Sequence, residues 1–167
     1  GEDWAINTLL DIYGEGSIDG IEIDLKKALG FAEKYAVGTN EKAKFFFAKA
    51  CEDGIVQGGV TLQEKNAGRA AELYASLVNS EQKEYREYAA VHLADMLMNG
   101  RGIEAKPAEA IQYYEIASKS GNLYAKTELC KALTLGPDEE KDYTKAKSLC
   151  RTLLVSGDEG AAAEALY

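Results

Sequence analysis

The sequence holds few residues that could carry out catalysis. Its single histidine, His92, has no second histidine with which to share a metal ion, and no serine and acid partners for a catalytic triad are evident. A lone ionisable side chain without partners rarely marks a catalytic site, so we expect His92 to be an ordinary surface or packing residue. We therefore predict no enzyme activity, no metal and no cofactor.

Carboxylate runs such as Glu52-Asp53 and residues 138–140 stand beside glycine or proline turns. General acid–base catalysis needs two carboxyl groups whose surroundings push their pKa values apart, whereas charge runs beside turns are usually solvated. No phosphate-binding loop motif is present, and a turn accounts for Gly100-Arg101-Gly102. These segments are interpreted as surface rather than as active sites.

Three cysteines, Cys51, Cys130 and Cys150, are too few for a disulfide-built fold and leave at least one unpaired. Cys130 and Cys150 fall at similar heights on two neighbouring predicted helices, so the geometry allows a bridge between them. Because cysteine commonly behaves as a small core hydrophobe, we expect buried free thiols instead.

Composition and charge narrow the class of protein. The 167 residues are 46% hydrophobic and include only 2 prolines, which favours one all-α domain over 1–167. The net charge of −9, without a basic stripe, argues against nucleic-acid binding and favours a neutral or basic protein surface as partner. The longest apolar stretch, 45–48, is far shorter than the roughly 20 residues that span a bilayer, so no membrane insertion is predicted.

No targeting segment is evident at the start of the chain. Gly1 is followed at once by a helical pattern, which suggests that such a segment has been trimmed. Secretion, a bacterial periplasm and the cytoplasm all stay open as locations.

A column of small residues recurs along the chain and sets the architecture. Its members, spaced by 38, 46, 36 and 36 residues, are Ala5, Ala43, Ala89, Ala125 and Ala161. Four and eight residues further on stand mostly larger apolar residues, namely Leu9, Phe47, Leu93, Leu129 and Ala165, then Tyr13, Cys51, Leu97 and Leu133. This spacing marks one face of a helix, so each unit begins with an amphipathic helix, here called helix A.

A second helix, here called helix B, completes each unit. A glycine ends each of the four complete A helices, where a left-handed residue is common, at Gly16, Gly54, Gly100 and Gly136. The stripes of helix B then begin with Ala28, Ala70, Ala110 and Ala146, and Asp24, Pro107 and Asp142 agree with helix N-termini. Between the helices, the loops 17–23 and 55–65 are longer than the minimum, and Gly54–Gly59 suggests mobility. Each hairpin needs its neighbour to cover its second face, so stacking is obligatory.

Residues 89–121 resemble a Sel-1-like repeat (SLR), a relative of the tetratricopeptide repeat (TPR). The resemblance rests on Ala89, Leu93 and Leu97, on the turn Gly100-x-Gly102-Ile103, on the site before Ala110, on the pair Tyr113-Tyr114 and on Gly121. The first and fourth units match except for the second glycine of the turn, and the second unit is degenerate.

The resemblance implies a right-handed α-solenoid of four helical hairpins with a partial fifth. The repeats are expected at about 3–39, 40–81, 85–121 and 122–157, with the partial one at 158–167. It also implies that the A helices line a concave surface, where an adaptor or scaffold binds a segment of another protein. Some secreted relatives tie hairpins with disulfides repeat after repeat, a pattern that would occur once here.

The residues of helix A outside the apolar stripe are then expected to face the concave side. Aligning the units gives these candidates for partner binding: Trp4, Asn7, Asp11, Lys42, Phe45, Lys49, Tyr88, Val91, Asp95, Met98, Asn99, Tyr124, Thr127, Lys131 and Thr134. Aromatic side chains with adaptable polar groups on a rigid surface are typical of peptide-binding sites. The alternative is that Trp4, Tyr88 and Tyr124 pack against helix B of the preceding repeat.

Two other interpretations stay open. Some relatives have been proposed to be hydrolases of the peptidoglycan or β-lactam type, which would require an unrecognised site in the irregular second repeat. The partial fifth repeat has no helix B to cover it, so the exposed ends of the solenoid are candidates for self-association or for junctions with further repeats.

Overall fold

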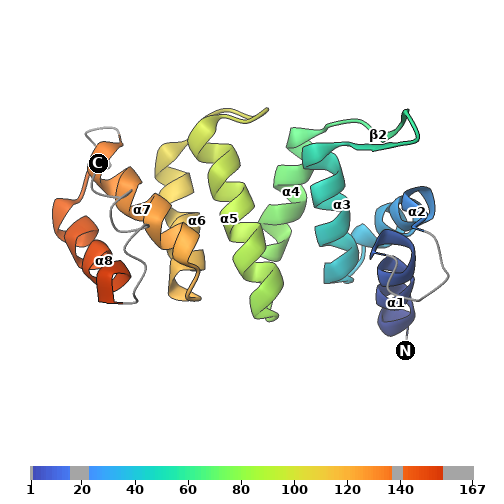
Figure 1. Ribbon diagram of the computed structural model, residues 1–167, viewed down its shortest axis with the longest axis horizontal. Helices are drawn as coiled ribbons and strands as arrows, with labels where there is room; N and C mark the ends of the chain where they lie inside the picture. Colours follow the sequence, from blue (N-terminus) through green and yellow to red (C-terminus); the bar gives the residue numbers. More distant parts are fainter. Residues whose placement is uncertain (1, 16–22, 137–140, 156–167) are drawn as a thin grey trace. The chain divides into compact units, whose positions relative to one another are not determined.

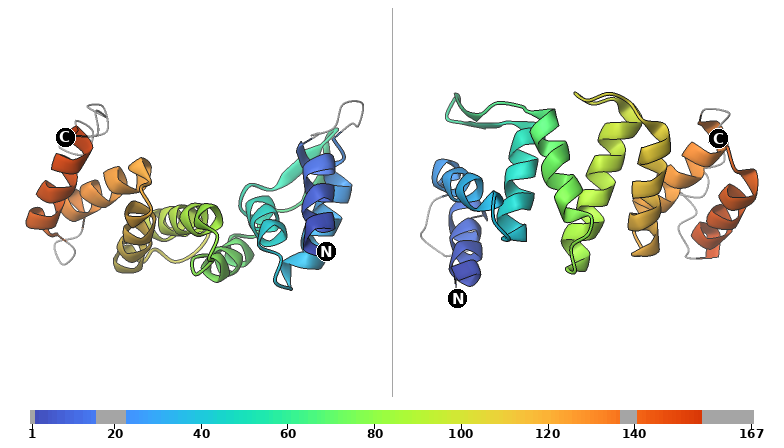
Figure 2. Two further views of the ribbon diagram at one scale, coloured as in Figure 1. Left: turned by 90° about the horizontal axis from the view of Figure 1, so that it is seen from below. Right: turned by 180° about the vertical axis from the view of Figure 1, so that it is seen from behind.

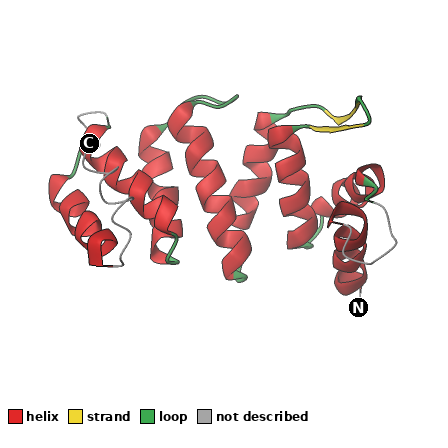
Figure 3. Cartoon of the chain, in the orientation of Figure 1, coloured by secondary structure: helices red, strands yellow, loops and turns green. Residues whose placement is uncertain are grey.

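The computed structural model describes residues 2–15, 23–136 and 141–155. In these ranges the chain is helical apart from connecting loops and one short β-hairpin (Figures 1 and 3). The helices are α1 (Glu2–Glu15), α2 (Leu25–Ala36), α3 (Glu41–Asp53), α4 (Ala67–Leu77), α5 (Lys83–Asn99), α6 (Pro107–Lys119), α7 (Leu123–Leu135) and α8 (Tyr143–Val155). The strands are β1 (Ile55–Gln57) and β2 (Val60–Gln63).

The chain divides into two compact units, Gly1–Ser80 and Glu81–Tyr167. In the first unit α1 packs on α2, α2 on α3 and α3 on α4, and in the second α5 packs on α6, α6 on α7 and α7 on α8. Within its unit, each helix therefore contacts its neighbours along the chain, as stacked helical hairpins do (Figure 2). The predicted all-α arrangement of hairpins is confirmed, while the single domain over 1–167 stays a prediction.

The predicted apolar stripes form the core of the hairpins except on α1, where Ile6 and Leu10 are buried instead of Ala5 and Leu9. On the A helices, Ala43, Ala89 and Ala125 are completely buried, and the larger residues Leu93 and Leu129 are nearly so. The matching alanines of the B helices are also buried, at Ala28, Ala70, Ala110 and Ala146. These small side chains let neighbouring helices approach closely. The first member of the column, Ala5, is exposed, and Ala161 and Ala165 lie outside the described residues.

One backbone hydrogen bond recurs in all four hairpins and closes the loop between helix A and helix B. In each hairpin, the residue before helix B donates its N–H to a carbonyl near the end of helix A. The bonds are Asp24 to Tyr13 at 2.9 Å, Asn66 to Cys51 at 2.6 Å, Lys106 to Leu97 at 2.8 Å and Asp142 to Leu133 at 3.0 Å. Because the bond spans the base of the loop, loops of different length join the same pair of helices.

The helix ends agree with the sequence analysis at most positions. Asp24 and Asp142 each accept a hydrogen bond from a backbone N–H of the first helical turn, at 3.0 Å and 2.9 Å, and Pro107 begins α6. Gly54 and Gly100 end α3 and α5 with positive φ angles of 73° and 63°.

Gly136 corrects the prediction of a left-handed glycine at every helix end. Its backbone is extended, with φ −66° and ψ −174°. The residue before a proline is pushed toward this region, and residue 137 is a proline. A Cβ at position 136 would lie 2.3 Å from the carbonyl oxygen of Ala132, so glycine is needed here for space rather than for φ. Gly16 lies outside the described residues.

The segment 55–65, predicted as a long loop, contains a β-hairpin, which corrects that prediction. β1 and β2 pair in antiparallel register, with Val56 opposite Thr61 and Gln57 opposite Val60. Gly58 and Gly59 form the two-residue turn with φ angles of 59° and 78°, the positive values that such hairpin turns require. The pair of glycines, with β-branched residues nearby at Val56, Val60 and Thr61, was the signal available in the sequence.

Candidate functional site

The predicted partner-binding residues all lie on, or at the end of, the first helix of a hairpin. In the first unit, α1 carries Trp4, Asn7 and Asp11, and α3 carries Lys42, Phe45 and Lys49. In the second unit, α5 carries Tyr88, Val91, Asp95, Met98 and Asn99, and α7 carries Tyr124, Thr127, Lys131 and Thr134.

Asp95 is the centre of a polar cluster in the second unit. Its Oδ1 accepts a hydrogen bond of 2.5 Å from the hydroxyl of Tyr114 on α6. The hydroxyl of Tyr124 on α7 lies 3.1 Å and 3.2 Å from the two carboxylate oxygens and donates to them. The Arg101 guanidinium approaches Oδ2 at 3.4 Å. Three successive helices and the loop after α5 therefore meet at one carboxylate, whose side chain is only 15% exposed.

The two tyrosines of this cluster remain neutral hydrogen-bond donors. Burial, followed by the hydrogen bond to Asp95, raises the pKa of the Tyr114 hydroxyl well above its ordinary value. Burial and the Asp95 carboxylate raise the pKa of Tyr124 to about 12, with Glu128 adding to the effect and Arg101 opposing it. The hydroxyls therefore hold the Asp95 carboxylate without contributing positive charge.

A second polar contact fastens α7 to α5. The side chain of Asn122 accepts a hydrogen bond of 2.8 Å from the N–H of Ala125, which caps α7. Its Nδ2 also donates to the carboxylate of Glu87 on α5 at 2.7 Å. Tyr88 follows Glu87 directly, and Tyr124 lies two residues after Asn122. The clasp between Glu87 and Asn122 therefore fixes the stretches of backbone that carry the two exposed tyrosines.

Tyr88 and Tyr124 keep 48% and 50% of their surface exposed, and Trp4 in the first unit keeps 73%. The alternative, in which these rings pack against helix B of the preceding repeat, stays a prediction. Val91 and Met98 are half-buried, and Asn99 donates to the backbone carbonyl of Asp95 at 2.9 Å.

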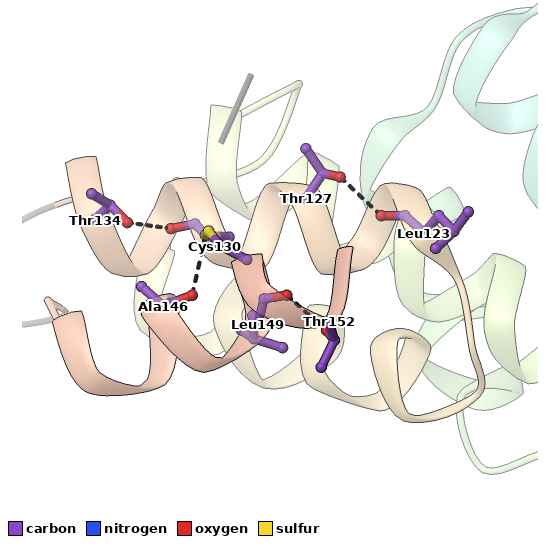
Figure 4. The surroundings of a disulfide bond; sticks show 8 residues. Leu123, Thr127, Cys130, Thr134, Ala146, Leu149 and Thr152 are labelled. Carbon is purple, nitrogen blue, oxygen red and sulfur yellow. Dashed lines mark hydrogen bonds between the residues drawn. A yellow bond between two sulfur atoms is a disulfide. The ribbon is translucent and has the colours of Figure 1, made fainter. Parts of the chain in front are cut away.

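The remaining candidates of α7 make contacts within their own helix. Thr127 is buried, and its hydroxyl donates to the carbonyl of Leu123 at 3.0 Å, while Thr134 donates to the carbonyl of Cys130 at 2.7 Å (Figure 4). Lys131 forms an ion pair with Glu128 at 3.0 Å. Thr127 therefore contributes to packing rather than to an exposed surface.

The first unit repeats both contacts of the second with different side chains. Asn40 caps α3 by accepting a hydrogen bond of 2.7 Å from Ala43, and its Nδ2 lies 3.0 Å from oxygens of Asp3 and Asn7 on α1. Lys42 forms an ion pair with Asp11. The ring of Phe45 lies 6.4 Å from that of Tyr74, and Lys49 is exposed.

Two predicted columns thus contact each other from one repeat to the next. Asp11 and Asp95 are both the sixth residue after the column alanine, and Lys42 and Tyr124 both directly precede the next one. The pairs Asp11 with Lys42 and Asp95 with Tyr124 are therefore equivalent junctions, one in each unit. Both columns were predicted from the sequence, but their pairing was not.

Several residues of this face were not singled out from the sequence. Asn40 and Asn122 both stand three residues before a column alanine, and Asp3 and Glu87 both stand two residues before one. This shared spacing was the sequence signal from which the contacts of Asn40 with Asp3 and of Asn122 with Glu87 could have been predicted. Tyr114 appeared only as part of the repeat motif, because its contact with Asp95 depends on how helix B packs on helix A.

Cys130 and Cys150 form a disulfide between α7 and α8, which corrects the expectation of free thiols. The Cα atoms are 6.5 Å apart, inside the range that a disulfide spans, and the Sγ of Cys130 lies 3.5 Å from the carbonyl oxygen of Ala146 (Figure 4). Cys51 is a buried free thiol, and burial raises its pKa. The sequence placed the two bridged cysteines at matching heights but could not decide their redox state.

The described residues hold no group of three histidine, cysteine or carboxylate side chains that could bind a metal ion. His92 is half-buried on α5. Among the helices that the structure describes, none combines the length and apolar character of a membrane-spanning segment.

Comparison with known proteins gives one family and a common fold. The family model described as Sel1 repeat matches residues 11–36, 40–55 and 87–122. The crystal structure of a Sel1 repeat protein from Oxalobacter formigenes is 24% identical, with a TM-score of 0.76 over 96% of this chain and 60% of that one. This likeness shows the solenoid fold, and the chain spans only those three fifths of that protein.

A second solved structure is more distant. The protective antigen c5321 of uropathogenic Escherichia coli, described as displaying an SLR fold, is 19% identical, with a TM-score of 0.48 over 98% of this chain and 40% of that one. The search of curated proteins gives no match.

Proposed function

Because this chain belongs to the Sel1-like repeat family, whose members generally serve as scaffolds for protein interactions, we propose that it is a non-enzymatic adaptor that binds a segment of another protein. The A helices present the binding surface, and in the second unit that surface is the face of α5 and α7 around Tyr88, Asp95 and Tyr124.

The proposal rests on a pair of half-exposed tyrosines whose two helices are joined by hydrogen bonds. Tyr88 and Tyr124 leave about half of their surface in solvent, although the helices below them are tied together by hydrogen bonds. Tyrosine supplies a large contact area at low entropic cost, and fixing it in advance reduces the cost of binding further. The bracing by Asp95 and by the clasp between Glu87 and Asn122 supports a role in recognition.

A random peptide library displayed on phage tests this proposal directly. Peptides selected on the wild-type chain are synthesised, and their affinities are measured for the wild type and for the double variant Tyr88→Ala, Tyr124→Ala. We expect the double variant to bind at least about tenfold more weakly, because two exposed aromatic contacts are lost.

The matched control is Tyr143→Ala. Tyr143 is an exposed tyrosine on α8, a helix that carries none of the residues of the proposed face, so its removal should leave the affinities unchanged. Circular dichroism of each variant verifies that helicity is retained. Undiminished binding by the double variant, or equal losses in the double variant and the control, would contradict the proposal.

No observation favours the alternative of a hydrolase. The irregular second repeat, where such a site was expected, consists of α3, the β-hairpin and α4, and the only histidine of the sequence lies on α5 instead. A turnover screen with peptidoglycan fragments and β-lactams separates this reading from the adaptor.

A further inference from the structure

At the two equivalent junctions, one in each unit, the residue of the next A helix that contacts the aspartate differs in charge. In the first unit, the Asp11 carboxylate receives the ammonium group of Lys42, and both side chains are partly withdrawn from solvent. At the equivalent junction of the second unit, the acidic residue is kept as Asp95, but Tyr124 stands in place of the lysine. Tyr124 donates a hydrogen bond to the carboxylate and brings no charge to it.

The charge of Asp95 is therefore balanced less closely than that of Asp11. Tyr114 and Tyr124 both donate as neutral hydroxyls, since their pKa values are raised. Arg101 approaches at 3.4 Å, longer than the 2.7–2.9 Å typical of a close charge-assisted hydrogen bond, and its side chain is 52% exposed. The guanidinium belongs to the loop after α5 and shows that a cation fits beside this carboxylate.

The aromatic ring beside the carboxylate also suits a cation. The hydroxyl of Tyr124 points to Asp95 while half of the residue stays in solvent. The face of a tyrosine ring attracts ammonium and guanidinium groups, and it does so more strongly when the site is partly desolvated. A net charge of −9 on the whole chain favours the approach of a basic segment over an acidic one.

We propose that the protein segment bound on this face places a lysine or arginine side chain against Asp95 and the ring of Tyr124. The partner's cation then takes the place at this junction that Lys42 takes at the junction of the first unit. This inference rests on the proposed function and specifies the chemistry of the partner: a neutral or basic segment with one essential cationic side chain.

The test uses the peptides selected from the phage library and their analogues in which lysine is replaced by norleucine, which keeps the aliphatic chain and removes the charge. We expect the selected peptides to contain lysine or arginine, and the norleucine analogue to bind wild-type protein about tenfold more weakly. In Asp95→Asn, which keeps an acceptor for the tyrosine hydroxyls, the difference between the two peptides should shrink to less than about threefold. Glu109→Gln, which removes a carboxylate from α6 in the same unit, should leave the difference intact.

A second variant tests the site by filling it. Tyr124→Lys builds the arrangement of Lys42 and Asp11 into the second unit, so its own ammonium should occupy Asp95 and abolish the preference for lysine over norleucine. Thermal unfolding of both variants verifies that the helices remain folded.

The outcomes separate this inference from the proposed function. Binding that depends on Tyr88 and Tyr124 but is equal for lysine and norleucine peptides overturns the cation site alone. Binding that is indifferent to both tyrosines overturns the adaptor face as well. Selected peptides without lysine or arginine, or a lysine preference that survives in Asp95→Asn, also overturn the cation site.

Discussion

At the scale of single residues, asparagine performs two tasks at the junctions between repeats. Asn40 and Asn122 each accept a hydrogen bond from the first turn of their own helix. Each also donates from its amide nitrogen to a carboxylate on the preceding helix A, Asp3 in one unit and Glu87 in the other. Aspartate or serine could cap the helix equally well, but neither offers an amide donor to the carboxylate.

Replacing Asn122 with aspartate should separate these tasks. Asn122→Asp keeps the oxygen that caps α7, but it sets a second negative charge against Glu87, so we expect the free energy of unfolding at neutral pH to fall by about 1–2 kcal/mol. The loss should diminish on acidification, because protonating one of the two carboxylates restores a donor. Urea unfolding at several pH values measures both effects.

The matched control is Asn66→Asp. Asn66 caps α4 by accepting a hydrogen bond of 2.9 Å from Arg69, and the structure gives its side chain no carboxylate partner among the described residues. A negative side chain suits a helix N-terminus, so this variant should be neutral or slightly stabilising. Equal destabilisation in the two variants would show that Asn122 acts only as a cap.

At the scale of elements, the sequence predicted what depends on local periodicity. Ala89, Leu93 and Leu97 lie on one face because a helix turns every 3.6 residues, so their burial followed from spacing alone. The hairpin of β1 and β2 was missed because a repeat pattern treats any insertion as a loop, although Gly58-Gly59 carried the turn signal. Gly136 was misjudged because its conformation is set by the proline after it rather than by the helix before it.

The disulfide between α7 and α8 should stabilise that pair of helices selectively. It links residues 20 positions apart. In the entropic model, closing a loop of that size raises the free energy of the unfolded chain by about 3 kcal/mol. We expect reduction to speed amide hydrogen exchange in α7 and α8 while leaving α3 and α4 unchanged, as measured by mass spectrometry.

Counting thiols provides the control for this prediction. Unfolding without a reductant should expose one alkylatable thiol, that of Cys51, and unfolding with a reductant should expose all 3. In the folded protein Cys51 should react slowly, because it is buried and its pKa is raised. Three reactive thiols without reductant would rule out the disulfide.

At the scale of the whole molecule, the repeat was predictable. The residues of the candidate face were predictable only in part, because Asp95 and Tyr124 were among the predicted residues whereas Glu87 and Asn122 were not. The columns containing Asp95 and Tyr124 came from alignment, since equivalent positions of a repeat face the same way. Their direct pairing was not predictable, because it depends on how far one hairpin is rotated against the next. The difference in charge between Lys42 and Tyr124 can be interpreted only from the structure, because the structure shows that each side chain contacts an aspartate.

Buried tyrosines in both units should make the whole chain sensitive to alkali. Tyr74 in the first unit and Tyr114 in the second are fully buried, and burial, reinforced by the carboxylates of Glu52 and Asp95, raises the pKa of each hydroxyl. An unfolded tyrosine ionises near pH 10, so above that pH the unfolded chain releases protons that the folded chain retains. The contribution of the two buried tyrosines to the free energy of unfolding is therefore complete below about pH 10 and is lost as the pH rises further.

We expect the free energy of unfolding in urea to decline above about pH 10, by up to about 1.4 kcal/mol per pH unit for each tyrosine that stays protonated only in the folded state. Tyr114→Phe lacks the hydrogen bond to Asp95 and should be less stable at neutral pH, but its stability should decline less steeply in alkali because one retained proton is gone. Tyrosinate absorbance of the folded protein gives an independent reading, with Tyr124 ionising near its pKa of about 12. Parallel alkaline declines for the wild type and Tyr114→Phe would show that the hydroxyl of Tyr114 ionises as readily in the folded chain as in the unfolded one.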